Sequence, residues 1–152
     1  MSNNYKLYRI VSAIIINNHS VLLVKSGDNE KAVWGLPGGQ VEGEESLEEA
    51  VIREVLEETG MDAVDLELAY IHESYIPQFN AHSLVTAFRV HASSLKFNIS
   101  NDPDNEIIDI CWVDFEKINQ FIANKQVASP LLEYINNFTP KYYLDRKLAW
   151  IE

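Results

Sequence analysis

The chain is short of the residues that mark several classes of protein. It has one cysteine, Cys111, which excludes an internal disulfide and a cysteine-based zinc cluster. Basic residues are scarce: 12 Lys and Arg stand against 23 Asp and Glu, a formal net charge of −11. The longest aliphatic run, VSAIIIN, is far too short to cross a bilayer, and MSNNYKLYR lacks the layout of a signal peptide. We therefore expect a cytoplasmic protein without nucleic-acid or membrane partners.

The composition that is present suits one globular domain over residues 1–152, with 47% hydrophobic residues and 23% charged residues. Strand-like and helix-like segments alternate, which predicts a mixed α/β fold. Strands are expected over 8–16, 20–26, 64–76, 83–92 and 106–114, with NNHS turning between the first two and NISNDPDN forming a loop before the last.

Three helices are expected from their capping signals. The first begins at Ser46, which forms an S-x-x-E capping box with Glu49, and it ends at Gly60. The second follows Asp114, and the third begins with Ser129 as its N-cap and Pro130 in its first turn. The aromatic tail from residue 139 onwards is expected to pack on the domain.

The segment GQVEGEESLEEAVIREVLEETGM is crowded with glutamate. At about 100° per residue, Glu54, Glu57 and Glu58 share an arc of about 100° on the first helix, and Ile52, Val55 and Leu56 fall roughly opposite, where they can face the core. Converging carboxylates suit Mg²⁺ or Mn²⁺, although a solvated helix face is the common alternative. Two of the acids lie in the last turn, where the helix dipole disfavours them without a cation.

The spacing of this segment resembles the signature of Nudix hydrolases, G-x5-E-x7-R-E-U-x-E-E-x-G-U, where U is aliphatic. The preceding WGLPGG resembles the usual lead-in of the family, whereas Gly43-Glu44-Glu45 departs from the common Pro-Gly-Glu. The resemblance implies the Nudix fold, an α/β/α sandwich around a mixed β-sheet. The positions that match are Gly39, Glu45, Arg53, Glu54, Val55, Glu57, Glu58, Gly60 and Met61.

The resemblance also implies an activity and roles for these residues. Family members hydrolyse nucleoside diphosphates linked to another moiety, so the expected substrate is a small nucleotide. Glu54, Glu57 and Glu58 would bind Mg²⁺ or Mn²⁺ together with the carbonyl of Gly38. Glu54 and Arg53 are assigned to the catalytic machinery: Glu54 as base or metal ligand, Arg53 through an ion pair with Glu45 that holds loop against helix.

Outside the helix, one further acid is expected at the metal. Glu106, just before a strand, is the first choice, against the alternative of a solvated loop acid, and Glu73 is the reserve. His72, His82 and His91 lack metal spacing and are interpreted as ordinary histidines. The position of Pro77 is reminiscent of the ADP-ribose-cleaving branch but equally suits a simple turn. Trp34, Tyr75 and Phe79 can stack on a base or pack in the core.

Two other functions stay open. A nucleotide-sensing module would bind without cleaving, although a sensor does not need the full acidic set. An isopentenyl diphosphate isomerase would need a cysteine-centred site, whereas Cys111 in DICWVD suggests a buried structural thiol. ADP-ribose, nucleoside triphosphates, dinucleoside polyphosphates and nucleotide sugars all fit the pattern, and many relatives form homodimers.

Overall fold

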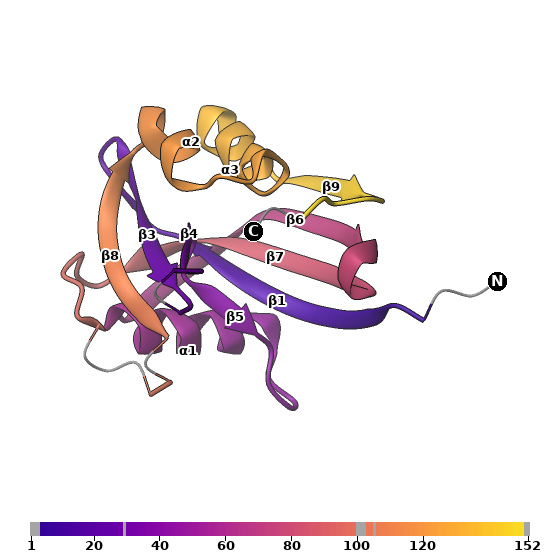
Figure 1. Cartoon of the computed structure of the whole chain (residues 1–152). Helices are drawn as coiled ribbons and strands as arrows, with labels where there is room; N and C mark the ends of the chain where they lie inside the picture. Colours follow the sequence, from indigo (N-terminus) through magenta and orange to yellow (C-terminus); the bar gives the residue numbers. More distant parts are fainter. Residues whose placement is uncertain (1–3, 29, 100–102, 105, 151–152) are drawn as a thin grey trace.

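The strands of the computed structural model form two sheets (Figure 1). The structure describes residues 4–28, 30–99, 103–104 and 106–150. The larger sheet is mixed: two of its neighbouring strand pairs are parallel and two are antiparallel. In spatial order its strands are β5 (Gly38–Gln40), β1 (Lys6–Ile14), β7 (Ala81–Ala92), β6 (Ala63–Ile76) and β9 (Lys141–Asp145).

The smaller sheet is antiparallel throughout its described pairs. Its strands are β2 (Ile16–Asn17), β3 (Ser20–Ser26), β4 (Val33–Gly35) and β8 (Ile107–Asp114). The predicted turn over NNHS is confirmed as the β2–β3 hairpin, with Asn18 in the left-handed region at φ 53°. The long strand β1 nevertheless pairs with β5 and β7 rather than with β3, because the chain passes from one sheet to the other after Ile14.

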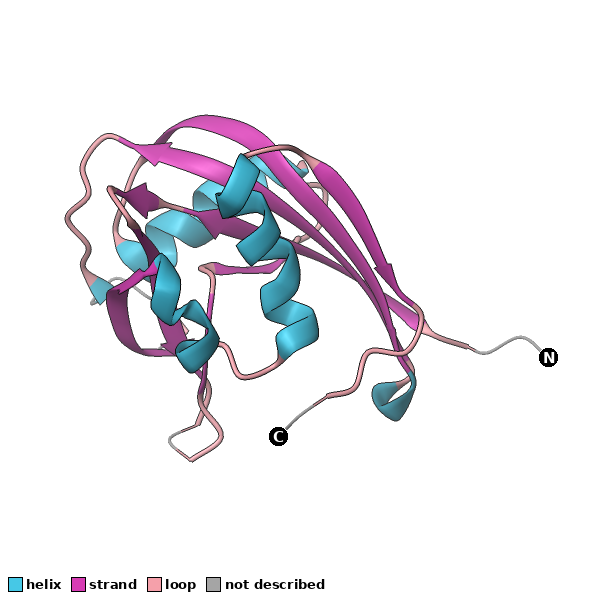
Figure 2. Cartoon of the chain, turned by 90° about the horizontal axis from the view of Figure 1, so that it is seen from above, coloured by secondary structure: helices cyan, strands magenta, loops and turns pink. Residues whose placement is uncertain are grey.

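Helices cover both sides of the strands, which confirms the predicted α/β class. Figure 1 shows α1 (Leu47–Thr59) below the sheets, and α2 (Ile118–Phe121) and α3 (Lys125–Asn137) above them. Figure 2, viewed from above, shows helices lying across the strands. The structure also has the 3-10 turns η1 (Pro77–Phe79) and η3 (Phe115–Lys117). Val51 and Val55 of α1 pack in one core cluster, and Leu131 of α3 packs in a second.

The helix α1 begins and ends where its sequence predicts. The Ser46 hydroxyl accepts from the Glu49 N–H at 3.0 Å, and the Glu49 carboxylate accepts from the Ser46 N–H at 2.9 Å. Gly60 stops the helix at φ 73°, a conformation that costs glycine little. Reciprocal capping at one end and glycine at the other therefore define the element that carries the acids.

The predicted orientation of α1 is wrong for two residues. Ile52 and Leu56 are 41% and 46% exposed, whereas Glu58 and Thr59 are buried with Val55. The helix is rotated toward its acidic side because that side faces β5, with which α1 makes extensive contact. The carboxylate of Glu58 consequently borders the core instead of projecting into solvent.

The predicted caps of the later helices are also wrong. The helix α3 begins at Lys125, where the Asn124 side chain accepts from the Gln126 N–H at 3.0 Å. Ser129 and Pro130 therefore lie inside the helix. Asp114 precedes η3 but makes no side-chain cap hydrogen bond. A short polar residue marks a helix start only when its backbone is extended there, and Asn124 meets that condition.

The predicted loop before β8 lies partly outside the described residues, since 100–102 and 105 are not among them. The tail packs as expected: β9 adds to the edge of the larger sheet beside β6, and Leu148 is 5% exposed. Within the described residues, no helix is long and apolar enough to span a membrane.

Candidate functional site

Gly38 and Gly39 of β5, called the glycine loop below, lie against β1 and against Glu54 of α1, respectively. A Cβ at Gly38 would overlap the carbonyl oxygen of Val11, and a Cβ at Gly39 would overlap the carboxylate of Glu54. The Gly38 N–H donates to Glu58 Oε1 at 2.8 Å, which joins strand β5 to the end of α1. Backbone groups and carboxylates thus meet in one place because neither glycine has a side chain.

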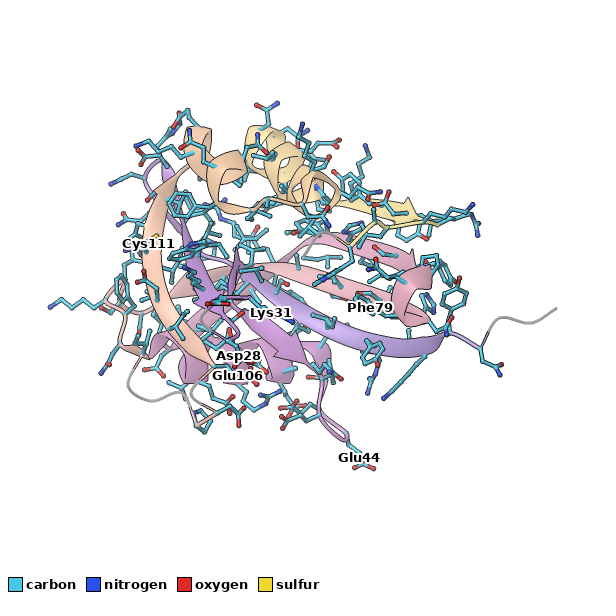
Figure 3. The ribbon with its side chains drawn as sticks, in the orientation of Figure 1. Asp28, Lys31, Glu44, Phe79, Glu106 and Cys111 are labelled. Atoms are coloured by element: carbon cyan, nitrogen blue, oxygen red, sulfur yellow. The ribbon has the colours of Figure 1, made fainter. Side chains whose placement is uncertain are left out.

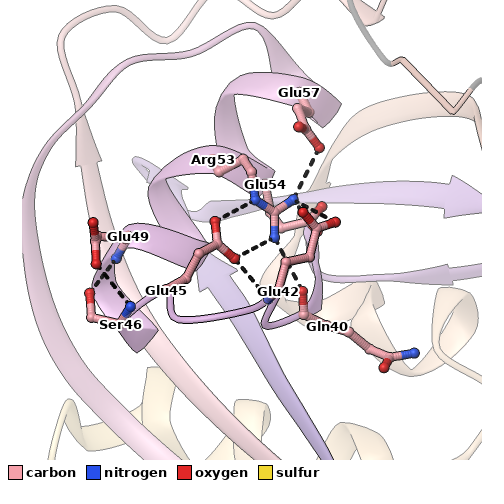
Figure 4. Close-up of polar contacts among 8 residues, drawn as sticks. All are labelled: Gln40, Glu42, Glu45, Ser46, Glu49, Arg53, Glu54 and Glu57. Carbon is pink, nitrogen blue, oxygen red and sulfur yellow. Dashed lines mark hydrogen bonds and ion pairs between the residues drawn. The ribbon is translucent and has the colours of Figure 1, made fainter.

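Arg53 lies at the centre of the acidic cluster (Figure 4). Its Nε and Nη2 donate to the two carboxylate oxygens of Glu45 at 2.7 and 3.0 Å, and its Nη2 also donates to the Gln40 carbonyl at 3.2 Å. Its Nη1 donates to Glu54 at 2.9 Å and to Glu57 at 3.2 Å. The predicted ion pair between Arg53 and Glu45 is therefore present, and it is bidentate.

The three predicted metal-binding carboxylates share one helix face but do not converge on one point. Glu54 and Glu57 point to Arg53, whereas Glu58 points to Gly38. Within the described residues, a different set brings one ligand atom each within 4.8 Å of the others, and it consists of Asp65, Glu67 and His91. That set is exposed on β6 and β7. Exposed acidic groups are common in proteins without a bound ion.

The cluster shifts the ionisation of its members in opposite directions. Burial raises the pKa of Glu54, while the hydrogen bond and positive charge of Arg53 act against that rise. The Arg53 guanidinium holds the pKa of Glu45 down to about 2, helped by the Glu42 backbone N–H. Glu45 in turn raises the pKa of Arg53, which stays charged. Glu54 thus binds a proton more readily than an exposed glutamate does.

Glu106 lies in the approach to β8, beside the turn that contains Gly27. Its backbone carbonyl accepts from the Gly27 N–H at 3.2 Å, and Figure 3 shows its side chain with Asp28 on the side of the molecule that carries α1. The side chain is exposed and makes no hydrogen bond or ion pair with another described residue. The geometry leaves this carboxylate available without bringing it into contact with Arg53.

Glu73, the reserve acid, is already engaged by two partners. Its carboxylate accepts from the Tyr142 hydroxyl at 2.6 Å and lies 2.5 Å from His82 Nε2, and these contacts lower its pKa. His72 and Ser74 line a cavity, so Glu73 between them lies on the opposite face of the strand. This occupied position sets Glu73 apart from the solvent-exposed Glu106.

The structure reveals a partly buried polar pair that the sequence did not indicate. His72 is 5% exposed, and its Nε2 lies 2.7 Å from Asp145 Oδ2. Asp145 belongs to β9, so the pair joins positions 73 residues apart in the chain. The only available signal was a histidine within an alternating strand, which is too common to identify a partner or a pocket.

The aromatic candidates divide between packing and cavities. Trp34 lines a cavity and meets Phe121 edge-on, with ring centroids 5.3 Å apart. Tyr75 stacks on His82 at 4.3 Å, and Phe79 meets Trp150 edge-on. Trp34 is therefore the one of the three predicted stacking residues that lines a described cavity.

Cys111 is half-buried in β8 against the core cluster that includes α3. Burial, followed by the nearby charge of Asp109, raises the pKa of its thiol. A thiol that resists deprotonation is a poor nucleophile, in keeping with the predicted structural cysteine.

Comparisons with known proteins agree with this architecture. The family model of the NUDIX domain matches residues 6–135. Phosphatase NudJ from Escherichia coli strain K12 is 30% identical over 129 residues, which covers 84% of this chain and 80% of NudJ.

Solved structures show the same fold. A NUDIX hydrolase from Nitrosomonas europaea aligns with a TM-score of 0.74 at 24% identity, covering 86% of this chain and 90% of that one. The MutT protein from Methanosarcina mazei Go1 aligns at 0.70 with 27% identity, covering 88% and 97%. The NUDIX domain of Shewanella oneidensis NrtR, complexed with ADP ribose, aligns at 0.71 with 22% identity, covering 88% of each.

Proposed function

This chain belongs to the NUDIX family, and we propose on that premise that it is a hydrolase that cleaves a diphosphate linkage in a nucleotide with the help of Mg²⁺ or Mn²⁺. The observation that carries the proposal is the placement of Glu54, Glu57 and Arg53 against the glycine loop. The name of NudJ, a phosphatase, supports hydrolysis rather than binding alone.

The residues of the site fit a divalent cation. Arg53 Nη1 lies 2.9 and 3.2 Å from oxygens of Glu54 and Glu57, so the space between these acids accepts positive charge. Glu54, Glu57 and Glu58 would hold the ion, with the Gly38 carbonyl and Glu106 as further ligands, because carboxylate and carbonyl oxygens are the donors that Mg²⁺ and Mn²⁺ prefer. A bound ion supplies positive charge against a diphosphate and lowers the pKa of water.

The side chains of the site have separate proposed roles in catalysis and in holding the site together. Glu54, whose pKa is raised by burial, is suited to accept a proton from the attacking water or to serve as a ligand. Arg53 keeps the loop and the helix in register through Glu45 and the Gln40 carbonyl. The net charge of −11 supports a nucleotide as the small-molecule partner rather than nucleic acid or anionic lipid, and a cytoplasmic setting and a homodimer belong to the same proposal.

The test is a panel of nucleotides assayed with Mg²⁺ and with Mn²⁺, in which added phosphatase releases phosphate from the products. The panel includes ADP-ribose, which the NrtR domain binds, and nucleoside triphosphates. We expect Glu54→Gln to keep the circular dichroism spectrum of the parent and to lose about 100-fold or more in turnover. Glu44→Gln, which changes an exposed acid of the same segment, should retain parental turnover. Equal turnover by Glu54→Gln and the parent would refute the assignment.

A sensor that binds without cleaving is the second candidate. It is favoured by the fact that Arg53 already neutralises two of the acids, while Glu58 points elsewhere. Calorimetric binding of a nucleotide in excess Mg²⁺, with no product after prolonged incubation, would select this candidate.

A further inference from the structure

Two adjoining cavities lie on the α2–α3 side of the molecule, the larger between the larger sheet and α3 and the smaller between β4 and α2. Their volumes are about 230 and 210 Å³, and both are lined by Ile122, Val127 and Trp150. The larger one extends to Gly35 and Leu36, directly before the loop that carries Gly38. The cavities are therefore close in the chain to the proposed site of hydrolysis.

Most residues that line the larger cavity are apolar, but one side of it has a row of polar residues from neighbouring strands. Strand pairing places Ser83 of β7, Ser74 of β6 and Asp145 of β9 side by side. Ser83, Ser74 and His72 line the cavity, and the His72 ring bonds through Nε2 to Asp145 at 2.7 Å and to Ser74 at 3.2 Å. A carboxylate can only accept, so Nε2 carries a proton. The other ring nitrogen, Nδ1, makes no hydrogen bond with a described residue.

The outer wall of the cavities comes from the end of the chain. Leu148 lines the larger cavity and Trp150 lines both, and these residues, with Asp145, lie beyond the segment 6–135 that matches the family. Figure 1 shows β9 beside β6, next to the end of α3.

Three hydrogen bonds anchor this wall to the domain. The Leu148 N–H donates to the Tyr75 carbonyl at 2.9 Å, and the Ala149 N–H donates to Gln126 Oε1 at 3.1 Å. Asn124 Nδ2 donates to the Ala149 carbonyl at 2.9 Å. The wall is held from two elements at once, so the cavity is formed before any ligand enters.

We propose that Leu148 and Trp150 complete a pocket for the base of the nucleotide, and that Asp145, from behind the pocket, orients His72 so that Nδ1 bonds to the edge of that base. This assignment rests on the proposed function and names the part of its substrate that the chain selects. Trp34 and Trp150 offer flat apolar surfaces to a heteroaromatic ring. Apolar walls with a few placed polar groups are typical of such sites.

Charge argues against a phosphate at this position. Among the described residues that line the two cavities, none is Lys or Arg, and the acid behind His72 would repel an anion. The diphosphate of a substrate therefore belongs at the α1 acids with their cation, and the uncharged end belongs in the pocket.

Binding without metal tests the pocket independently of hydrolysis. AMP, GMP, CMP and UMP are titrated in the absence of divalent ions while tryptophan fluorescence is read. We expect one base to bind tightest, and Asp145→Asn and His72→Gln to weaken that binding about tenfold, which corresponds to one hydrogen bond in a closed site. The differences in affinity among the four nucleotides should be smaller in Asp145→Asn and His72→Gln than in the parent. Trp150→Phe should reduce the quenching.

Glu133→Gln is the matched control. It makes the same acid-to-amide change between α3 and β9, where Glu133 pairs with Lys141 at 2.8 Å on the exposed surface. We expect this variant to bind within twofold of the parent. Circular dichroism shows whether His72→Gln folds, and Asp145→Asn, whose side chain is partly exposed and keeps its shape, provides the second reading.

Kinetics with ATP, GTP, CTP and UTP in Mg²⁺ separate the two proposals. In Asp145→Asn and His72→Gln, a rise in KM for the triphosphate that carries the preferred base, with kcat within twofold of the parent, supports the pocket. If binding depends on the base but no nucleotide is hydrolysed, the proposed function is refuted and the pocket is still supported. Parental affinities and base preference in both Asp145→Asn and His72→Gln would overturn the pocket.

Discussion

In the candidate site, the positive charge of one side chain, Arg53, is shared by several glutamates. Its five N–H donors serve three glutamates and one backbone carbonyl. The last turn of α1 has no basic residue, although Glu57 and Glu58 lie there at the negative end of the helix dipole. The motif predicted the contact of Arg53 with Glu45, but not that Glu54 and Glu57 share the same guanidinium.

The pair of Glu45 and Arg53 makes stability depend on pH. The pKa of Glu45 is about 2 in the folded chain against an ordinary value of 4.5, so its contribution is complete above pH 4.5. As the pH falls from 4.5 toward 2, the unfolded chain binds the proton first and the contribution is lost. We expect Glu45→Gln to have a lower melting temperature than the parent at pH 6, with a gap that closes over this range. Thermal denaturation followed by circular dichroism from pH 6 to pH 2.5 measures it.

Glu44→Gln is the control for that experiment, because it removes one neighbouring negative charge but no described ion pair. Its melting temperature should differ from that of the parent by a similar amount at each pH. A gap between Glu45→Gln and the parent that stayed constant down to pH 2.5 would contradict the role of the ion pair.

At the scale of elements, α3 has two candidate N-cap residues in its sequence, and only one of them begins the helix. Ser129 and Pro130 have the chemistry of a helix start, yet Asn124 begins the helix five residues earlier. Pro130 lacks the N–H that an interior position uses, but it is buried, and Leu131 beside it is 1% exposed. Burial of this apolar stretch outweighs the missing hydrogen bond, and Asn124 both caps the helix and holds the tail through Ala149.

Substitutions at the two candidate caps distinguish these assignments. Asn124→Ala removes the cap and the tether, and we expect it to lower the free energy of unfolding by about 1–2 kcal/mol. Asn124→Asp keeps the accepting oxygen and loses the tether alone, so its effect should be smaller. Ser129→Ala should be nearly neutral because Ser129 is an exposed interior position. Urea denaturation measures all three, and a cost of about 1 kcal/mol for Ser129→Ala would restore Ser129 as the cap.

At the scale of the whole molecule, two acidic clusters lie on different elements. The α1 acids border the glycine loop, and Asp65, Glu67 and His91 lie on exposed parts of β6 and β7. The second set is the more tightly clustered, but its members are exposed, whereas Glu58 of the first set is buried and accepts from the Gly38 N–H. The cation is therefore expected at α1.

Manganese should stabilise the folded chain through the α1 acids. An ion that binds only the folded state at a hundredfold excess over its Kd stabilises by about 2.7 kcal/mol. We expect the melting temperature of the parent to rise with Mn²⁺ and to return on addition of EDTA, and Glu54→Gln combined with Glu57→Gln to abolish the rise. Glu67→Gln should keep it. Loss of the rise in Glu67→Gln alone would place the ion at the exposed cluster.

The sequence by itself determined the acid-bearing helix, its caps, the longer strands and the family signature, because each depends on residues within one turn or one short segment. The short strands β4 and β5, directly before the helix, were not among the strands expected. The assignment of residues 1–152 to a single domain and the metal-binding roles of the site residues stay predictions. Only the tertiary structure decided which face of α1 is buried, that β1 pairs with β7 rather than β3, and that Asp145 meets His72. Those outcomes depend on contacts between segments far apart in the chain, whose free energies no local pattern records.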